Sequence, residues 1–150
     1  MKQVFGKVMF GLALIALFSA TAAVGFAAGV PFKGWGNAEI ISAVPVPNGV
    51  SMTAVAEGNA THLGNFTREE HILLNPETGA FTGDVTFTAA DGSQLTAALT
   101  GQFTSAASAL GSYTFTGGTG RFADTTGSAD FSAVLSDAVH FTVEFEGNFD

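Results

Sequence analysis

The sequence predicts an all-β protein: an eight-stranded antiparallel up-and-down β-barrel that follows an N-terminal signal peptide. Apolar and polar residues alternate with a period of two through most of the chain, which is typical of strands with one buried face. Gly, Asn, Asp and Pro separate these segments, and no long run with helical spacing follows the N-terminal segment. With 15 Phe among 150 residues, such a sheet has a large apolar face to bury.

Residues 1–28 are interpreted as a signal peptide. Two lysines precede an apolar segment, and Ala20-Thr21-Ala22 has the A-x-A pattern of a cleavage site, so cleavage is expected near 22–28. A membrane anchor is disfavoured because the apolar segment is shorter than the ~18–20 residues of a membrane span. We therefore expect a secreted or periplasmic protein with a single β-barrel domain at 29–150 and no membrane span in its mature form.

Four strands are expected in the first half of the domain. The first lies around 39–44, and the second follows at 50–57 after a Pro- and Gly-containing turn. The third, at 66–74, carries polar side chains on both faces, so the sequence does not show which face points into the barrel. The fourth, at 81–89, has the clearest pattern, because Phe and Val alternate with Thr and Asp.

Four more strands are expected in the second half. They lie at 95–104, around Tyr113 and Phe115, at 128–135 and at 139–146. Between strands four and five, Asp91-Gly92 is expected to form a tight hairpin turn, because both residues can take positive φ. The small residues at 105–110 suggest a longer loop between strands five and six.

The spacing of the strands favours a barrel over a two-sheet sandwich. Evenly spaced hairpins leave no long crossover for a Greek key. Closure also removes the exposed edges of a Thr- and Phe-rich sheet. The outer face would carry more Thr, Ser and Ala than Lys and Glu. Such a wall can be a solvent-exposed polar surface of modest charge, or it can contact a second subunit. The sequence is therefore compatible with a monomer and with a homo-oligomer.

The composition excludes several classes of function. The formal net charge is −8, and Lys33, Arg68 and Arg121 are the only basic residues after the signal peptide. Three cations cannot supply the footprint that nucleic acid or an anionic membrane surface requires. The chain has no Cys, which excludes disulfides, thiol chemistry and Cys-bound zinc. Its three His lack metal-site spacing, so neither a metal nor another cofactor is expected.

Two carboxylates and two imidazoles are candidates for acid–base catalysis. Glu69 and Glu70 project to opposite faces of the third strand, so one of them is expected to point into the barrel. His62 and His71 could approach each other across neighbouring strands. Arg68 shares a face with Glu70, and a structural ion pair between these two is the alternative.

The glycine-rich segment at 117–127, GGTGRFADTTG, matches the dinucleotide pattern G-x-G-x-x-A, but no helical pattern follows it. We expect its glycines to bend the chain at a barrel end. The segment is similar to the G-G-T/S-G-x-F-x-x-A-x-G motif of the allene oxide cyclase and dirigent barrels, with Thr125 in place of the usual Ala. Residues 60–67, ATHLGNFT, resemble a segment of small exported bacterial proteins with the same barrel-like ending.

This resemblance implies an eight-stranded barrel, often trimeric, with a cavity for apolar molecules. Relatives in those families cyclise an epoxy fatty acid or orient phenoxy radicals. The resemblance makes the matched glycines and Phe122 determinants of the fold, without a chemical role.

The leading functional hypothesis is an exported barrel that binds an apolar or aromatic small molecule in a cavity of roughly 300 Å³ or more. An isomerase- or cyclase-type enzyme with an inward Glu or His is one alternative, and a structural or interaction protein of the cell envelope with a filled barrel is another. The single Trp is expected to plug a barrel end or to line a ligand mouth. The candidate ligand-binding residues are Trp35, Phe87, Phe103, Tyr113, Phe115, Phe131 and Phe141.

Overall fold

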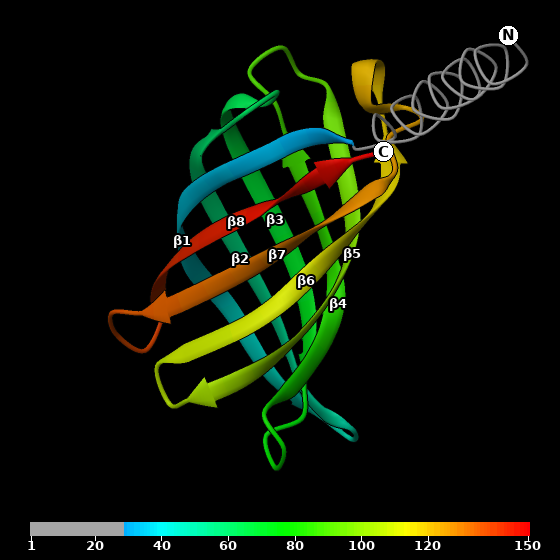
Figure 1. Cartoon of the computed structure of the whole chain (residues 1–150). Helices are drawn as coiled ribbons and strands as arrows, with labels where there is room; N and C mark the ends of the chain where they lie inside the picture. The colour runs from blue at the N-terminus through cyan, green and yellow to red at the C-terminus, as the bar shows by residue number, and fades with distance from the viewer. Residues whose placement is uncertain (1–28) are drawn as a thin grey trace, which may run out of the picture.

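The structure, a computed structural model, is a closed barrel of eight antiparallel strands (Figure 1). It describes residues 29–150, and the predicted signal peptide lies outside them. Each strand pairs with the next in the chain, and β8 pairs with β1, which confirms the predicted up-and-down topology. Among the described residues, no helix is long and apolar enough to cross a membrane. The elements are β1 (Val30–Val46), β2 (Gly49–Ala60), β3 (Gly64–Leu74), β4 (Ala80–Thr88), β5 (Gln94–Ser105), β6 (Ser108–Gly118), the short 3-10 helix η1 (Gly120–Phe122), β7 (Gly127–Leu135) and β8 (His140–Phe149).

Strand β1 begins at Val30, well before the predicted start at residue 39. Its inward positions between Phe32 and Ala38 are Gly34 and Gly36, so the sequence shows no alternation of apolar and polar residues there. Gly34 lies where a side chain would collide with the core. A Cβ there would lie 2.8 Å from the Phe145 ring and 2.5 Å from Ala60. The missing side chain therefore leaves room for a large neighbouring ring.

Two connections also differ from the prediction. The expected long loop at 105–110 is a tight hairpin, in which Ser105 pairs with Ser108 and their hydroxyl oxygens lie 2.7 Å apart. The β4–β5 connection is longer than a two-residue turn, because β4 ends at Thr88 and β5 begins at Gln94. In this connection Gly92 has positive φ, but Asp91 does not. The Asp91 carboxylate instead accepts a hydrogen bond from the Ser93 N–H.

The glycines at the end of β6 and at the start of η1 bend the chain at a barrel end, as predicted. Gly117 and Gly120 have φ values of 111° and 57°, which residues with a Cβ rarely adopt. A Cβ on Gly120 would also lie 2.4 Å from the Ser93 hydroxyl. The bend leads into η1, whose Phe122 ring is buried.

Aromatic rings fill one half of the barrel. Phe32 is fully buried, with its ring centroid 4.8 Å from that of Phe149 and 5.3 Å from those of Phe115 and Phe145. Stacked and edge-to-face rings at such distances add attraction to the gain from burying apolar surface. We call this group the aromatic cluster; it consists of Phe32, Phe66, Phe87, Phe115, Phe145 and Phe149.

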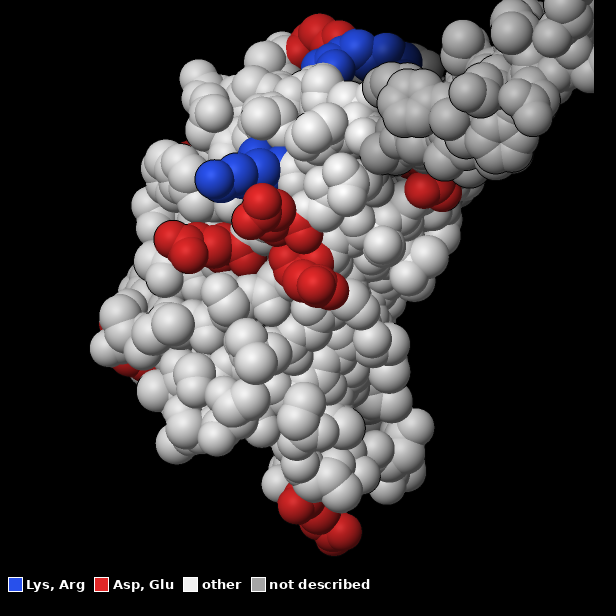
Figure 2. Space-filling model, viewed as in Figure 1, with Lys and Arg blue, Asp and Glu red and all other residues white. Residues whose placement is uncertain are grey.

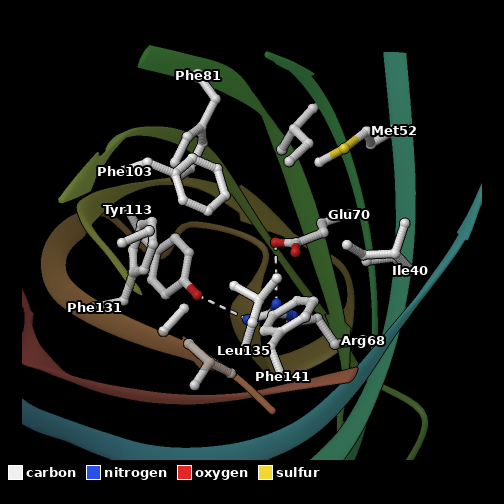
Figure 3. A pocket seen from close by; sticks show the side chains of 15 residues that line it. Ile40, Met52, Arg68, Glu70, Phe81, Phe103, Tyr113, Phe131, Leu135 and Phe141 are labelled. Atoms are coloured by element: carbon white, nitrogen blue, oxygen red, sulfur yellow. Dashed lines mark hydrogen bonds and ion pairs between the residues drawn. The ribbon is translucent and has the colours of Figure 1, made fainter. Parts of the chain in front are cut away.

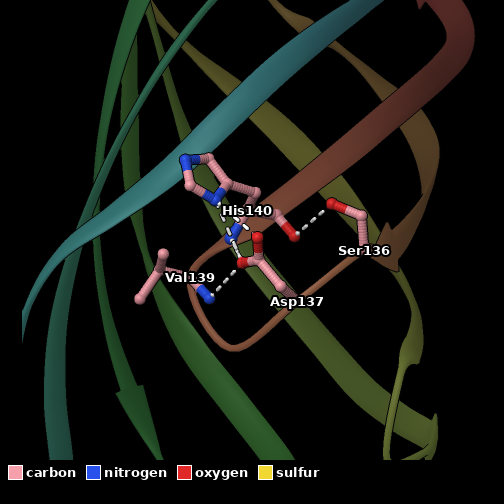
Figure 4. Close-up of polar contacts among 4 residues, drawn as sticks. All are labelled: Ser136, Asp137, Val139 and His140. Atoms are coloured by element: carbon pink, nitrogen blue, oxygen red, sulfur yellow. Dashed lines mark hydrogen bonds and ion pairs between the residues drawn. The ribbon is translucent and has the colours of Figure 1, made fainter.

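A charged turn connects β7 to β8 (Figure 4). The Asp137 carboxylate accepts hydrogen bonds from the backbone N–H groups of Val139 and His140, and it lies 2.9 Å from the His140 ring nitrogen Nδ1. These two backbone donors, followed by the imidazole, lower the pKa of Asp137 to about 2. The turn is therefore held in one geometry by local polar contacts.

The outer wall carries few charges, as the sequence suggested. In Figure 2 a basic side chain and several acidic ones gather on one face, and most of the surface around them is uncharged. Lys33 on β1 pairs in register with Glu146 on β8, which in turn lies opposite Asp130 on β7.

Candidate functional site

The two ends of the barrel differ. At one end the side chains of Leu63 and Phe122 are buried, and the Phe122 ring lies beside Phe149 of the aromatic cluster. Arg121 ties this closed end together, because its Nε donates to the Asp91 carboxylate at 2.8 Å and its Nη1 donates to the carbonyl oxygen of His62. The hydrogen bond from Arg121 is the main cause of a lowered pKa at Asp91. We call the opposite end, formed by the four short hairpins, the open end (Figure 1).

A ring of half-buried apolar side chains surrounds the open end. Each of these side chains comes from a different strand and lines the space inside the barrel. Buried apolar residues complete the wall around the space, including Phe81, which lies beside Phe103, and Phe131 (Figure 3). We call the ring the rim; it consists of Ile40, Met52, Ile72, Phe103 and Leu135.

The space inside the rim measures about 50 Å³. That is room for a few water molecules. It is far below the roughly 300 Å³ of a typical ligand pocket. The expectation of a continuous cavity large enough for a whole ligand is therefore wrong for this structure, because the aromatic cluster fills the other half of the barrel.

Three polar side chains lie at the bottom of this space. Arg68 on β3 reaches across the barrel to β6, where its Nη1 donates to the Tyr113 hydroxyl oxygen at 2.8 Å (Figure 3). Its Nη2 lies 3.0 Å from Oε2 of Glu70, and the two side chains are 1% and 10% exposed. The other half of the barrel lies beneath, with Arg68 Cζ 5.8 Å from the Phe87 ring centre. We call Arg68, Glu70 and Tyr113 the polar triad.

The charges of the polar triad are balanced. Burial alone lowers the pKa of Arg68, but Tyr113 and Glu70 together raise it above its ordinary value. Arg68 is therefore a buried cation, and the adjacent Glu70 supplies the compensating negative charge.

One nitrogen of the polar triad has no hydrogen-bond partner. Arg68 Nε is buried without a hydrogen-bond partner, and it is the single buried side-chain nitrogen or oxygen in 29–150 of which this is true. A guanidinium offers five N–H groups in a fixed fork, of which the contacts to Glu70 and Tyr113 use two. A buried donor without an acceptor costs free energy. Donation of a hydrogen bond from this N–H to an acceptor would therefore be energetically favourable.

The buried phenol leads to a prediction about alkaline pH. Burial raises the pKa of Tyr113 from 10.0 to about 12, although the nearby Arg68 opposes the rise. Because the folded state favours the neutral phenol, this contribution to stability is complete below pH 10 and is lost as the pH rises to about 12. Tyr113 is the single Tyr of the chain, so the ultraviolet absorbance of tyrosinate reports on it alone.

We expect a titration midpoint near pH 12 for the folded protein and near 10.0 in concentrated urea. Circular dichroism at each pH is the control for unfolding. A midpoint near 10.0 with the β-sheet signal intact would contradict the burial of the hydroxyl.

The aromatic candidates divide among three places. Phe103, Tyr113, Phe131 and Phe141 line the space at the open end. Phe87 and Phe115 belong to the aromatic cluster. Trp35 lies on the outer wall and is 51% exposed, so its expected place at a barrel end is wrong. Since β1 continues through this residue with Gly34 and Gly36 facing inward, Trp35 must face outward.

The acid–base candidates also separate. Glu70 faces inward and takes part in the predicted alternative, the ion pair with Arg68. Glu69 and His71 face outward and pair with each other at 2.8 Å. His62 sits in the β2–β3 turn with φ of 67°, and its Nε2 donates to the Pro31 carbonyl oxygen at 3.0 Å. Among residues 29–150, no three His, Cys, Asp or Glu side chains are grouped so that they could hold a metal ion.

The sequence interpretation missed Arg68 as a site residue. It treated Arg68 only as a partner for Glu70, although the period of two placed both on the face of Phe66 and Ile72. A cation on a face with large apolar residues was the available signal. Its partner Tyr113 is 45 residues away, so no local pattern could show their contact.

Comparison of the chain with protein-family models, with curated proteins and with solved structures gives no match. The eight-stranded antiparallel barrel that the resemblance implied is present. Membership of the allene oxide cyclase and dirigent barrels stays a prediction.

Proposed function

We propose that this protein is exported and that its open end binds a small apolar molecule. The observation that carries the proposal is the difference between the two barrel ends. Aromatic rings fill one end, whereas the other has an apolar rim above a small space. The polar triad forms the buried floor of this space. A buried ion pair is not required for the stability of a barrel, because a protein with well-packed apolar residues in its place is often as stable.

The size of the space determines how much of a ligand can enter. About 50 Å³ admits one end of a molecule, while the rest lies against the rim. Met52, with its unbranched thioether, and Leu135 are half-buried at the entrance and can change rotamer to widen it at low cost. The apolar wall favours a hydrocarbon body, because binding removes apolar surface of both partners from water.

The test uses ethylbenzene, a neutral aromatic hydrocarbon, and amide NMR spectra of the protein. We expect saturable shifts for residues of the rim and of the wall beneath it. Replacing Leu135 by Trp narrows the entrance and should weaken binding by about tenfold or more, equivalent to about 1.4 kcal/mol. The control is Val134→Trp, because Val134 neighbours Leu135 on β7 but faces outward and is 55% exposed.

Val134→Trp should leave the affinity unchanged, and both variants should keep the dispersed amide spectrum of a folded barrel. Shifts scattered over the outer wall, or equal affinities for the two variants, would contradict binding at the open end.

A further inference from the structure

A buried donor at the floor of the open end indicates what kind of ligand fits there. Arg68 lines the space inside the rim, and its Nε–H has no acceptor. The Tyr113 oxygen accepts a hydrogen bond from Arg68 Nη1, and Arg68 offers no acceptor in return. The phenolic proton of Tyr113 is therefore left for a different acceptor. The floor thus supplies two hydrogen-bond donors from neighbouring side chains.

The charge balance of the floor excludes an anion as the preferred partner. Glu70 already compensates the charge of Arg68, with 3.0 Å between the two groups. A ligand carboxylate would bring a second negative charge next to Glu70 in an apolar surrounding, which is costly without a second cation. Lys33 and Arg121 are the other basic residues of the described barrel. Lys33 is exposed on the outer wall, and Arg121 pairs with Asp91 at the closed end, so neither can help.

A neutral acceptor has no such cost. Arg68 Nε is fully enclosed, so the guanidinium has to turn slightly toward the space before a carbonyl oxygen can accept from its Nε–H; the Tyr113 hydroxyl can donate to the same oxygen, and the net charge of the floor does not change. Hydrogen bonds from a charged donor are stronger than neutral ones. The space of about 50 Å³ suits a group of a few heavy atoms, such as an acetyl group.

We infer that the ligand is an uncharged apolar molecule whose inner end carries a hydrogen-bond acceptor such as a ketone or ester carbonyl, bound by Arg68 Nε–H with the help of Tyr113. This inference rests on the proposed function, because it names the chemistry of the molecule that enters the open end. It makes Arg68 a ligand-binding residue as well as a partner of Glu70.

Three probes of similar shape separate the two proposals. Ethylbenzene has no acceptor, acetophenone has a neutral carbonyl, and benzoate has a carboxylate. We expect acetophenone to bind about tenfold or more tightly than ethylbenzene, because it pairs a buried donor that is otherwise unpaired. Benzoate should bind more weakly than acetophenone at neutral pH.

The side-chain Nε–H signals of arginine give a direct readout. The chain has two arginines, so the resonance of Arg68 can be compared with that of Arg121 as an internal control. Acetophenone should move the Arg68 Nε–H resonance and leave that of Arg121 in place. Ethylbenzene should shift the rim amides with a much smaller effect on Arg68. The measurement needs no substitution and therefore does not depend on how a variant folds.

A variant adds a second test. Arg68→Met combined with Glu70→Leu removes both charges and keeps similar volumes, so we expect the ratio of the two affinities to fall and the preference for acetophenone over ethylbenzene to be lost. Equal affinities of the wild type for the two neutral probes, an unmoved Arg68 resonance, or tighter binding of benzoate would overturn this inference alone. Failure of all three probes to bind would overturn the proposed function, and the inference with it.

Discussion

Replacing Phe32 by Ala is expected to lower the free energy of unfolding by about 3–5 kcal/mol, the usual cost of truncating a buried Phe. Phe32 is 0% exposed, and four rings of the aromatic cluster lie around it, the closest with its centroid at 4.8 Å. The strands on all sides are tied by backbone hydrogen bonds, so the barrel cannot collapse into the hole. Urea denaturation followed by circular dichroism measures the change.

The matched control is Trp35→Ala on the same strand. Trp35 is an even larger aromatic residue, but its 51% exposure on the outer wall predicts a loss within about 0.5 kcal/mol. A loss below about 1 kcal/mol for Phe32→Ala, or equal losses for the two variants, would contradict the packing of the closed end.

Breaking the buried ion pair is expected to have a similar effect. Arg68→Met leaves the Glu70 carboxylate without its cation in an apolar barrel, at a cost of about 3–5 kcal/mol. Removing both charges with Arg68→Met and Glu70→Leu restores a neutral interior and should be about as stable as the wild type, or more stable. The four proteins of this cycle, including Glu70→Leu alone, are compared by urea denaturation at neutral pH.

The exposed pair of Glu69 and His71 supplies the control on the same strand. Its side chains are 58% and 54% exposed, so Glu69→Gln should change stability by about 1 kcal/mol or less. If the double variant at Arg68 and Glu70 were as unstable as the two single losses added together, the two side chains would not be coupled. That result would contradict the polar triad as described.

The two large effects have different implications for function. Phe32 holds the closed end and touches no part of the open end, so its loss should affect stability alone. The ion pair is not needed for stability if the double variant is stable. Its presence at the floor of the open end is then best explained by ligand binding, the function proposed above.

Most of the fold could be predicted from the sequence because its signals are local. The segment 81–89 alternates Phe and Val with Thr and Asp, and β4 occupies nearly the same residues, at Ala80–Thr88. The start of β1 could not be predicted, because Gly34 and Gly36 carry no apolar side chain to mark the inward face. The hairpin at Ser105 was also missed, since small residues are common in both loops and tight turns.

The candidate site could be predicted only in part. The sequence showed that either Glu69 or Glu70 would face inward and that Arg68 could pair with Glu70, and the structure contains that pair. It could not show which face of β3 was inward, because both carried polar groups. Nor could it show how much of the interior the Phe side chains fill, which depends on how rings from different strands meet.

By itself the sequence determined that this chain forms an antiparallel β-barrel with few charges and an interior rich in Phe, because a period of two and turn residues act within a few positions of the chain. Only the tertiary structure decided that Arg68 meets Tyr113, that the aromatic cluster fills one half, and that an apolar rim surrounds the other. These features require barrel closure, which brings β3 opposite β6 and β8 beside β1, and closure depends on contacts between residues far apart in the chain.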